Sequence, residues 1–104
     1  MAQFDAYANP VAAARRAYPY VVILQSAVAG HGRDTIVAPL APSAAFMPVT
    51  GRLTPVVPLD ASDYVVIIPA LTSVRTGDLD TLAGSLLRYR TELMAAIDYL
   101  FFGV

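Results

Sequence analysis

The sequence predicts an α+β fold that is mainly β: a small antiparallel, barrel-like sheet followed by one C-terminal α-helix. Three observations support this prediction. Short β-branched and aromatic segments alternate with turn residues along most of the chain. The eight prolines fit this picture, because a sheet tolerates proline at its edges and turns. After Gly84-Ser85 the apolar residues recur every three or four positions, which is typical of a helix.

Six segments are predicted as strands, because they are rich in β-branched and aromatic residues or alternate in polarity, and turn signals bound them. They are Gln3–Ala8, Tyr20–Gln25, Thr35–Leu40, Leu53–Asp60, Asp63–Ile68 and Leu71–Arg75. Pro39 predicts an edge or a strand end in the third segment. Ala61-Ser62 predicts a short hairpin loop between the fourth and fifth. Val11–Arg16 is too short for a helix without tertiary support, so we expect a loop there.

The helix predicted after Gly84-Ser85 is amphipathic. Its apolar residues share one face: Leu86, Tyr89, Leu93, Ile97 and Leu100. Arg88, Glu92 and Asp98 fall toward the opposite face, and Gly103 is a plausible C-terminal stop. No linker or internal repeat is apparent, so residues 1–104 are expected to form a single domain.

The composition predicts a second copy or another partner. Of the 104 residues, 57% are hydrophobic and 14% are charged, against roughly 45–50% and about 25% in average domains. Tyr20–Leu24 and Tyr64–Ile68 are continuously apolar, which suits strands covered on both faces, here by the helix and by a second subunit. The net charge of −1 and the lack of lysine argue against nucleic-acid binding by general electrostatics. The longest apolar run, Val65–Leu71, is too short to span a bilayer, and a cytoplasmic location is expected.

Nothing in the sequence requires an enzyme, and neither a cofactor nor a metal is expected. The absence of cysteine excludes disulfide scaffolds, zinc ribbons and thiol nucleophiles. His31 is the only histidine and lies between two glycines, so a triad with Ser26 and Asp34 would lack rigid support. The remaining paired aspartates flank turns, where Asp is a common turn former; they are Asp60, Asp63, Asp78 and Asp80.

The C-terminal segment Tyr99–Val104 contains no charged side chain, although free termini are usually polar unless they are tied down. On a helix, Phe102 would lie about 200° from Leu100 at roughly 100° per residue, so both cannot face the same core. Two alternatives follow. Phe102 packs against another part of the fold, or it is an exposed aromatic anchor for a partner.

Several segments occur in an order that resembles the CcdB family of plasmid-borne toxins. They are Gln3–Tyr7, Leu24–Ser26, Ile36–Leu40, Pro55–Val57, Leu71–Val74 and Ala96–Val104. The aromatic-aromatic-Gly-aliphatic ending is the most specific of them. The resemblance implies an antiparallel Src-homology-3-like barrel of the type shared by CcdB and MazF toxins, and a homodimer built across the sheet faces.

The implied function is that of the toxin in a type II toxin–antitoxin system, which acts by binding and is not an enzyme. Such a toxin is a DNA gyrase inhibitor: the dimer enters the cavity of the gyrase A subunit dimer and traps the cleaved-DNA complex of this topoisomerase II. A CcdA-like antitoxin neutralises it with a disordered C-terminal segment. The pair represses its own operon, with the antitoxin contacting DNA, and the module serves plasmid maintenance.

Carried over by position, the expected gyrase-binding residues lie at the C-terminus and in one loop: Phe102, Gly103, Val104, Asp98, Ala95 and Val28. The family typically has Trp where this chain has Phe102, which keeps a cation–π face although Trp is the better ring. Asp98 and Ala95 stand where familiar members have Asn, and Asp98 adds a charge and removes two donors. A weakened, retargeted or decayed toxin is therefore one open interpretation.

Two other functions stay open. A MazF-like endoribonuclease would need a loop arginine with a nearby hydroxyl or acid, and the candidate set is Arg33 with Thr50 or Thr72. The other is an inert or decayed dimer subunit that retains antitoxin binding.

Overall fold

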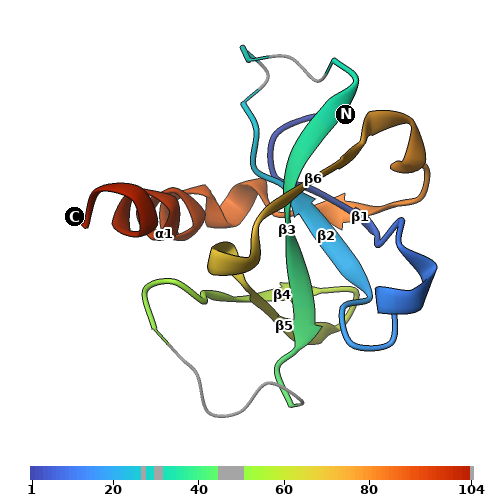
Figure 1. The fold of residues 1–104 in the computed structure, drawn as a ribbon. Coiled ribbons are helices and arrows are strands. Elements are labelled where there is room, and N and C mark those ends of the chain that lie inside the picture. Colours follow the sequence, from blue (N-terminus) through green and yellow to red (C-terminus); the bar gives the residue numbers. More distant parts are fainter. Residues whose placement is uncertain (27, 30–31, 45–50, 104) are drawn as a thin grey trace.

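In the computed structural model, the sheet curls into a half-barrel and the C-terminal α-helix, α1 (Arg90–Phe102), extends from it (Figure 1). The structure describes residues 1–104 except 27, 30–31, 45–50 and 104. Seven strands are found in the described part of the chain: β1 (Asp5–Ala8), β2 (Tyr20–Ile23), β3 (Asp34–Pro42), β4 (Val56–Leu59), β5 (Ser62–Val66), β6 (Thr72–Arg75) and β7 (Leu82–Ser85). The predicted fold class, a mainly β antiparallel sheet with a C-terminal helix, is confirmed.

Every strand pairing is antiparallel, and the order is β4-β5-β3-β2-β1-β7 with β6 paired to β3. The long strand β3 organises the sheet. Along one edge it pairs with β2, and along the other edge it pairs first with β6 and then with β5. This arrangement lets two short strands continue each other along a single edge of β3.

The prediction that Pro39 marks an edge or a strand end is wrong. Pro39 lies inside β3, opposite Val21 of β2. Its carbonyl accepts a hydrogen bond of 3.0 Å from Ile67 N–H, at the point where β3 exchanges β6 for β5. A proline can occupy this central strand because the partner strand is interrupted where a backbone N–H would otherwise be needed.

The hairpin between β4 and β5 turns at Asp60-Ala61, one residue before the predicted loop. Both residues have positive φ, 52° and 65°. A two-residue turn with both central residues in this region is the type I′ geometry that matches the twist of the flanking strands. Asp tolerates this region well, whereas Ala at φ 65° is strained.

The chain enters the helix later than predicted. Leu82–Ser85 is strand β7, and a 3-10 turn over Leu87–Tyr89 precedes α1. Gly84 lies where β7 approaches the β4 side of the barrel: a Cβ at this position would meet Leu59 Cδ1 at 3.0 Å. Close packing therefore explains a glycine inside a strand. Ala12–Ala14, in the segment predicted as a loop, likewise forms a short 3-10 turn.

The main core lies between the sheet and α1. From the helix, Leu93 and Ala96 are fully buried, while Ile97 and Leu100 are only half-buried. Phe4 is fully buried at φ 69°, where its N–H donates to Ile23 O and its carbonyl accepts from Leu86 N–H, both at 2.7 Å. These two bonds tie the first turn of the chain to β2 and to the approach of the helix.

The opposite faces of the central strands are covered by the chain itself. Leu79 joins Val21, Ile23 and Val37 in a second buried cluster, and half-buried Val74 packs against it. A third cluster on β3 and β5 is covered by Tyr18 and consists of Ala41, Val65 and Ile67. The outer faces of the two apolar segments thus do not depend on a second subunit, contrary to the expectation from composition.

Candidate functional site

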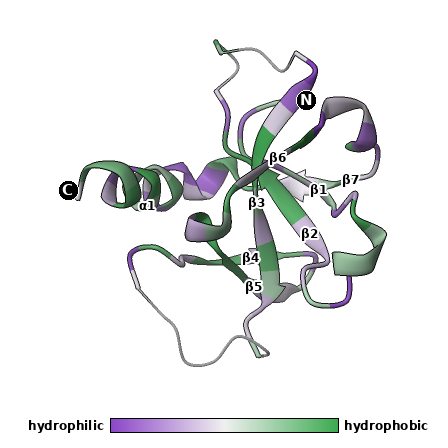
Figure 2. Cartoon of the chain, in the orientation of Figure 1, coloured by the Kyte–Doolittle hydropathy of each residue, from purple (hydrophilic) through white to green (hydrophobic). Residues whose placement is uncertain are grey.

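The exposed side of α1 brings several of the expected binding residues together. At about 100° per residue, Asp98, Tyr99 and Phe102 lie within roughly 60° of Ala95 around the helix axis. All four side chains are exposed. We call these four residues the outer stripe. In Figure 2 the terminal turns of α1 are mainly hydrophobic, although they lie at the periphery of the molecule.

Phe102 is the more exposed of the two aromatic residues in the outer stripe, with 75% of its surface accessible against 36% for Tyr99. Between the two alternatives for this ring, the structure therefore selects exposure over packing. Gly103 ends the helix in the left-handed region at φ 73°, and its N–H donates to Tyr99 O at 3.0 Å. Gly103 is thus the predicted C-terminal stop, because this conformation favours glycine. Val104 lies outside the described residues.

Val28 is not brought to the outer stripe. It is 99% exposed in a turn after β2, where Ala29 N–H donates to both the carbonyl and the hydroxyl oxygen of Ser26 at 3.1 Å. In Figure 1 this segment lies at the top of the molecule, whereas the end of α1 extends to the left. Within one chain, the two expected contact regions are separate.

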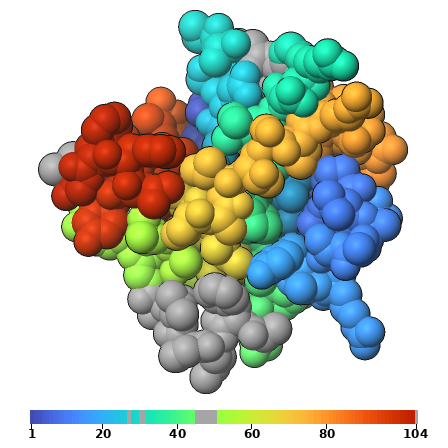
Figure 3. Space-filling view, viewed as in Figure 1, coloured from blue at the N-terminus to red at the C-terminus, as the bar shows by residue number. Residues whose placement is uncertain are grey.

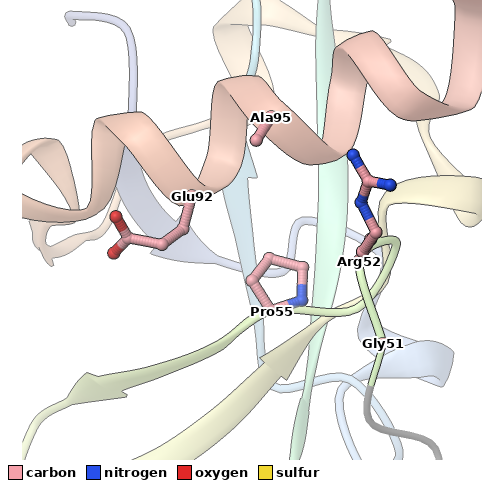
Figure 4. A pocket seen from close by; sticks show the side chains of 5 residues that line it. All are labelled: Gly51, Arg52, Pro55, Glu92 and Ala95. Carbon is pink, nitrogen blue, oxygen red and sulfur yellow. The ribbon is translucent and has the colours of Figure 1, made fainter. Parts of the chain in front are cut away.

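One flank of the outer stripe opens on a hollow of about 500 Å³ between the helix and the segment that leads into β4. Figure 4 shows the five residues that line it: Gly51, Arg52, Pro55, Glu92 and Ala95. In this view, the side chains of Glu92 and Arg52 lie on opposite sides of Ala95. The Arg52 guanidinium carbon also lies 4.2 Å from the centroid of the Tyr99 ring, within cation–π range.

The other flank of the helix borders an apolar groove of about 290 Å³. It is lined by Leu24, Gln25, Ile36, Leu71, Ile97 and Phe101. In Figure 3 the atoms of α1 and those of the segment around Leu71 lie side by side. Phe101 is 60% exposed and was not among the expected site residues. The sequence did contain a signal for Phe101: it follows Ile97 by four residues, so the two side chains are neighbours on the helix surface.

Of the residues proposed for an endoribonuclease, the two that the structure describes, Arg33 and Thr72, line different pockets. Arg33 lines a polar hollow with Arg75, Thr76 and Asp78, whereas Thr72 lines a different pocket with Val37 and Val74. The Thr76 hydroxyl, which belongs to the same hollow as Arg33, lies 2.7 Å from the Thr35 hydroxyl in a hydrogen bond. Thr50, like the triad candidate His31, lies outside the described residues.

A shifted pKa is found at a tyrosine pair outside the outer stripe, formed by Tyr20 and Tyr64. The rings of Tyr20 and Tyr64 meet edge to face with centroids 5.3 Å apart. Burial raises the pKa of Tyr64, and the neighbouring Tyr20 hydroxyl and Asp60 raise it further. Tyr64 packs against the main core. The pair therefore belongs to the packing of the sheet.

Neither a metal cluster nor a membrane-crossing helix is found where the structure describes the chain. No three His, Cys, Asp or Glu side chains gather there in a way that could hold an ion. The helices in the same residues are too short or too polar to cross a bilayer.

The fold and the exposed C-terminal aromatics define a sheet-and-helix protein whose terminal helix carries exposed aromatic side chains. A family model described as CcdB protein matches residues 3–103. The chain therefore belongs to the CcdB family and is a toxin of the toxin–antitoxin type. A comparison with curated proteins finds no match.

Proposed function

We propose that this chain is the toxin of a type II toxin–antitoxin module, and that it poisons DNA gyrase by trapping the cleaved-DNA complex. The observation that carries the proposal is the 75% exposure of Phe102 at the end of α1. An aromatic ring that contributes little to its own fold and lies on a helix with an exposed apolar end is typical of a binding hot spot. Its action needs no catalytic group.

Asp98 supports binding to a basic partner. In the family, the aromatic residue at the Phe102 position stacks on a gyrase arginine. Asp98 and Phe102 are four residues apart in α1 and are therefore neighbours on its surface. A guanidinium lying on the Phe102 ring can also donate hydrogen bonds to the Asp98 carboxylate. The carboxylate thus offsets part of the loss from replacing Trp with the weaker cation–π ring of Phe.

The apolar groove is the proposed contact of the homodimer. Its lining includes Phe101, 60% exposed, and Ile36, 37% exposed. Covering these side chains with the same surface of a second copy removes apolar area from water. A dimer also offers a way to bring Val28 of one copy toward the outer stripe of the other, which a single chain does not do. Both regions can then contact the gyrase A subunit together.

The remaining partners follow from the same proposal. A CcdA-like antitoxin neutralises the toxin, and DNA is contacted only through the antitoxin complex, which represses the operon. This module acts in plasmid maintenance, in the cytoplasm. The formal net charge of −1 agrees with an indirect role in DNA binding.

The deciding experiment is expression in a gyrase-sensitive host, combined with a cleavage assay on purified gyrase. We expect growth arrest and accumulation of cleaved complex with the wild-type protein, and neither with Phe102→Ala. RNA cleavage that Arg33→Ala abolishes, without cleaved complex, would support the endoribonuclease instead. A wild-type protein that binds antitoxin but arrests no growth would be the inert subunit.

A further inference from the structure

Arg52 packs on Tyr99, a member of the outer stripe, and the two side chains form a ridge. The guanidinium carbon lies 4.2 Å from the ring centroid, where the negative face of the ring attracts a cation. Arg52 is exposed and Tyr99 is 36% exposed, so the pair joins the segment before β4 to α1 at the surface. The exposed surface of the outer stripe therefore continues from α1 onto the segment before β4.

The turn that carries Arg52 is held on both sides. Thr54 N–H donates to Gly51 O at 3.1 Å and closes the turn, and Ile68 N–H donates to Leu53 O at 3.3 Å. Thr54 itself is buried, with 6% of its surface accessible. Because these contacts anchor the turn to the core, Arg52 is presented from a defined place.

Arg52 lines two hollows. The larger one, about 500 Å³, has Ala95 between Arg52 and Glu92 (Figure 4). The smaller one, about 310 Å³, lies toward Leu53 and Pro69 and is lined by both Arg52 and Tyr99. Ala95 leaves room in the larger hollow because its side chain is a single methyl group. An apolar side chain of a partner fits there, with a cation on one side and an anion on the other.

We propose that Arg52, positioned by Tyr99, is a specificity-determining residue of this surface, and that it selects a protein segment carrying a carboxylate next to an apolar side chain. The inference rests on the proposed function, with the gyrase A subunit as the partner. A guanidinium held over a ring by cation–π attraction still has N–H groups that can donate to both oxygens of a carboxylate. Glu92 disfavours a carboxylate on its own side of the hollow, so the two charges also set the direction of the bound segment.

The test measures the affinity of full-length variants for the purified gyrase A subunit at low and high salt. Arg52→Gln should lose about tenfold in affinity, because a charge-assisted hydrogen bond is removed. This loss should shrink at high salt, where exposed charges are screened. The matched control is Arg88→Gln, which makes the same change at an exposed position outside the ridge and should leave the affinity unchanged.

The positioning role is read separately, in the free protein. Nuclear magnetic resonance should show the Arg52 side-chain protons shifted upfield by the Tyr99 ring. Tyr99→Phe should keep this shift and bind within about twofold of wild type, since the ring is retained. Tyr99→Leu should lose the shift and about fivefold in affinity, since the guanidinium is no longer held.

The outcomes distinguish the two proposals. If wild-type protein does not bind gyrase, the proposed function is wrong, and the gyrase A subunit is not the partner that Arg52 selects. If wild type binds and Arg52→Gln binds equally well, the proposed function stands and the specificity role of Arg52 is overturned. If the ring shift is absent, or if Tyr99→Leu binds like Tyr99→Phe, positioning by Tyr99 is overturned.

Discussion

Phe102→Ala is expected to leave the fold almost unchanged while removing most of the affinity for the target. Phe102 is 75% exposed, so only about a quarter of its side-chain surface is withdrawn from water on folding. Full burial of a phenylalanine stabilises by about 1.5–3 kcal/mol, which makes a quarter worth about 0.4–0.8 kcal/mol. Alanine is the better helix former and offsets about 0.5 kcal/mol of this. The net change in unfolding free energy is therefore below about 0.5 kcal/mol, or a shift in Tm of less than about 4 °C.

The same substitution has a much larger effect on binding. Truncating an aromatic hot spot costs about 2 kcal/mol or more. Since about 1.4 kcal/mol corresponds to a tenfold change, the Kd for the gyrase A subunit should rise roughly 30-fold. The assay is titration of each variant into this gyrase component, combined with a thermal melt followed by circular dichroism.

Leu87→Ala provides the control, because Leu87 is 57% exposed but lies before α1 and outside the outer stripe. It should match Phe102→Ala in Tm and wild type in affinity. A fall in Tm of more than about 10 °C for Phe102→Ala would mean that the ring is a core residue. Equal affinity of Phe102→Ala and wild type would remove Phe102 from the binding surface.

Three further predictions concern stability. Leu93→Ala should cost about 2–5 kcal/mol in chemical denaturation, because the fully buried side chain leaves a cavity under the helix; a cost below about 1 kcal/mol would contradict this packing. Ala61→Gly should stabilise by about 1 kcal/mol by relieving the positive φ, whereas Ala13→Gly, at a position without positive φ, should not stabilise. Burial raises the pKa of Tyr64, so the stability it contributes is full below the ordinary tyrosine value of about 10 and is lost as the pH rises toward the raised value. Tyr64→Phe should flatten this alkaline decline in the denaturation midpoint, and an unchanged slope would refute the assignment.

Local composition predicted the strands whose residues favour extended backbone wherever they lie. The β-branched and aromatic runs in β2 and β5 are examples, since such side chains pack well on a pleated surface. The strand β7, with the sequence Leu-Ala-Gly-Ser, carries no such signal. It is extended because it pairs with β1 and because Gly84 fits closely against Leu59. Both contacts are long-range, so no local pattern could reveal them.

The candidate site divides in the same way. Six residues were expected at the target surface by position, and the structure brings Ala95, Asp98 and Phe102 together on one exposed side of the helix. That grouping follows from helical periodicity alone. Phe101 and Arg52 were missed, because their importance comes from neighbours distant in sequence: Leu24 and Ile36 for Phe101, and Tyr99 for Arg52.

By itself, the sequence determined a mainly β chain with a C-terminal helix, an apolar surplus and an uncharged end. These properties follow from the amino-acid composition and from the spacing of apolar residues along the chain, which can be read without knowing the contacts between distant segments. The periodicity also placed Phe102 and Leu100 on different sides of the helix. Only the tertiary structure decided that no described segment covers Phe102 while Leu79 and Tyr18 cover the outer faces of the sheet. Exposure depends on what the rest of the chain brings alongside a residue, and that is set by strand pairing and packing across the whole fold.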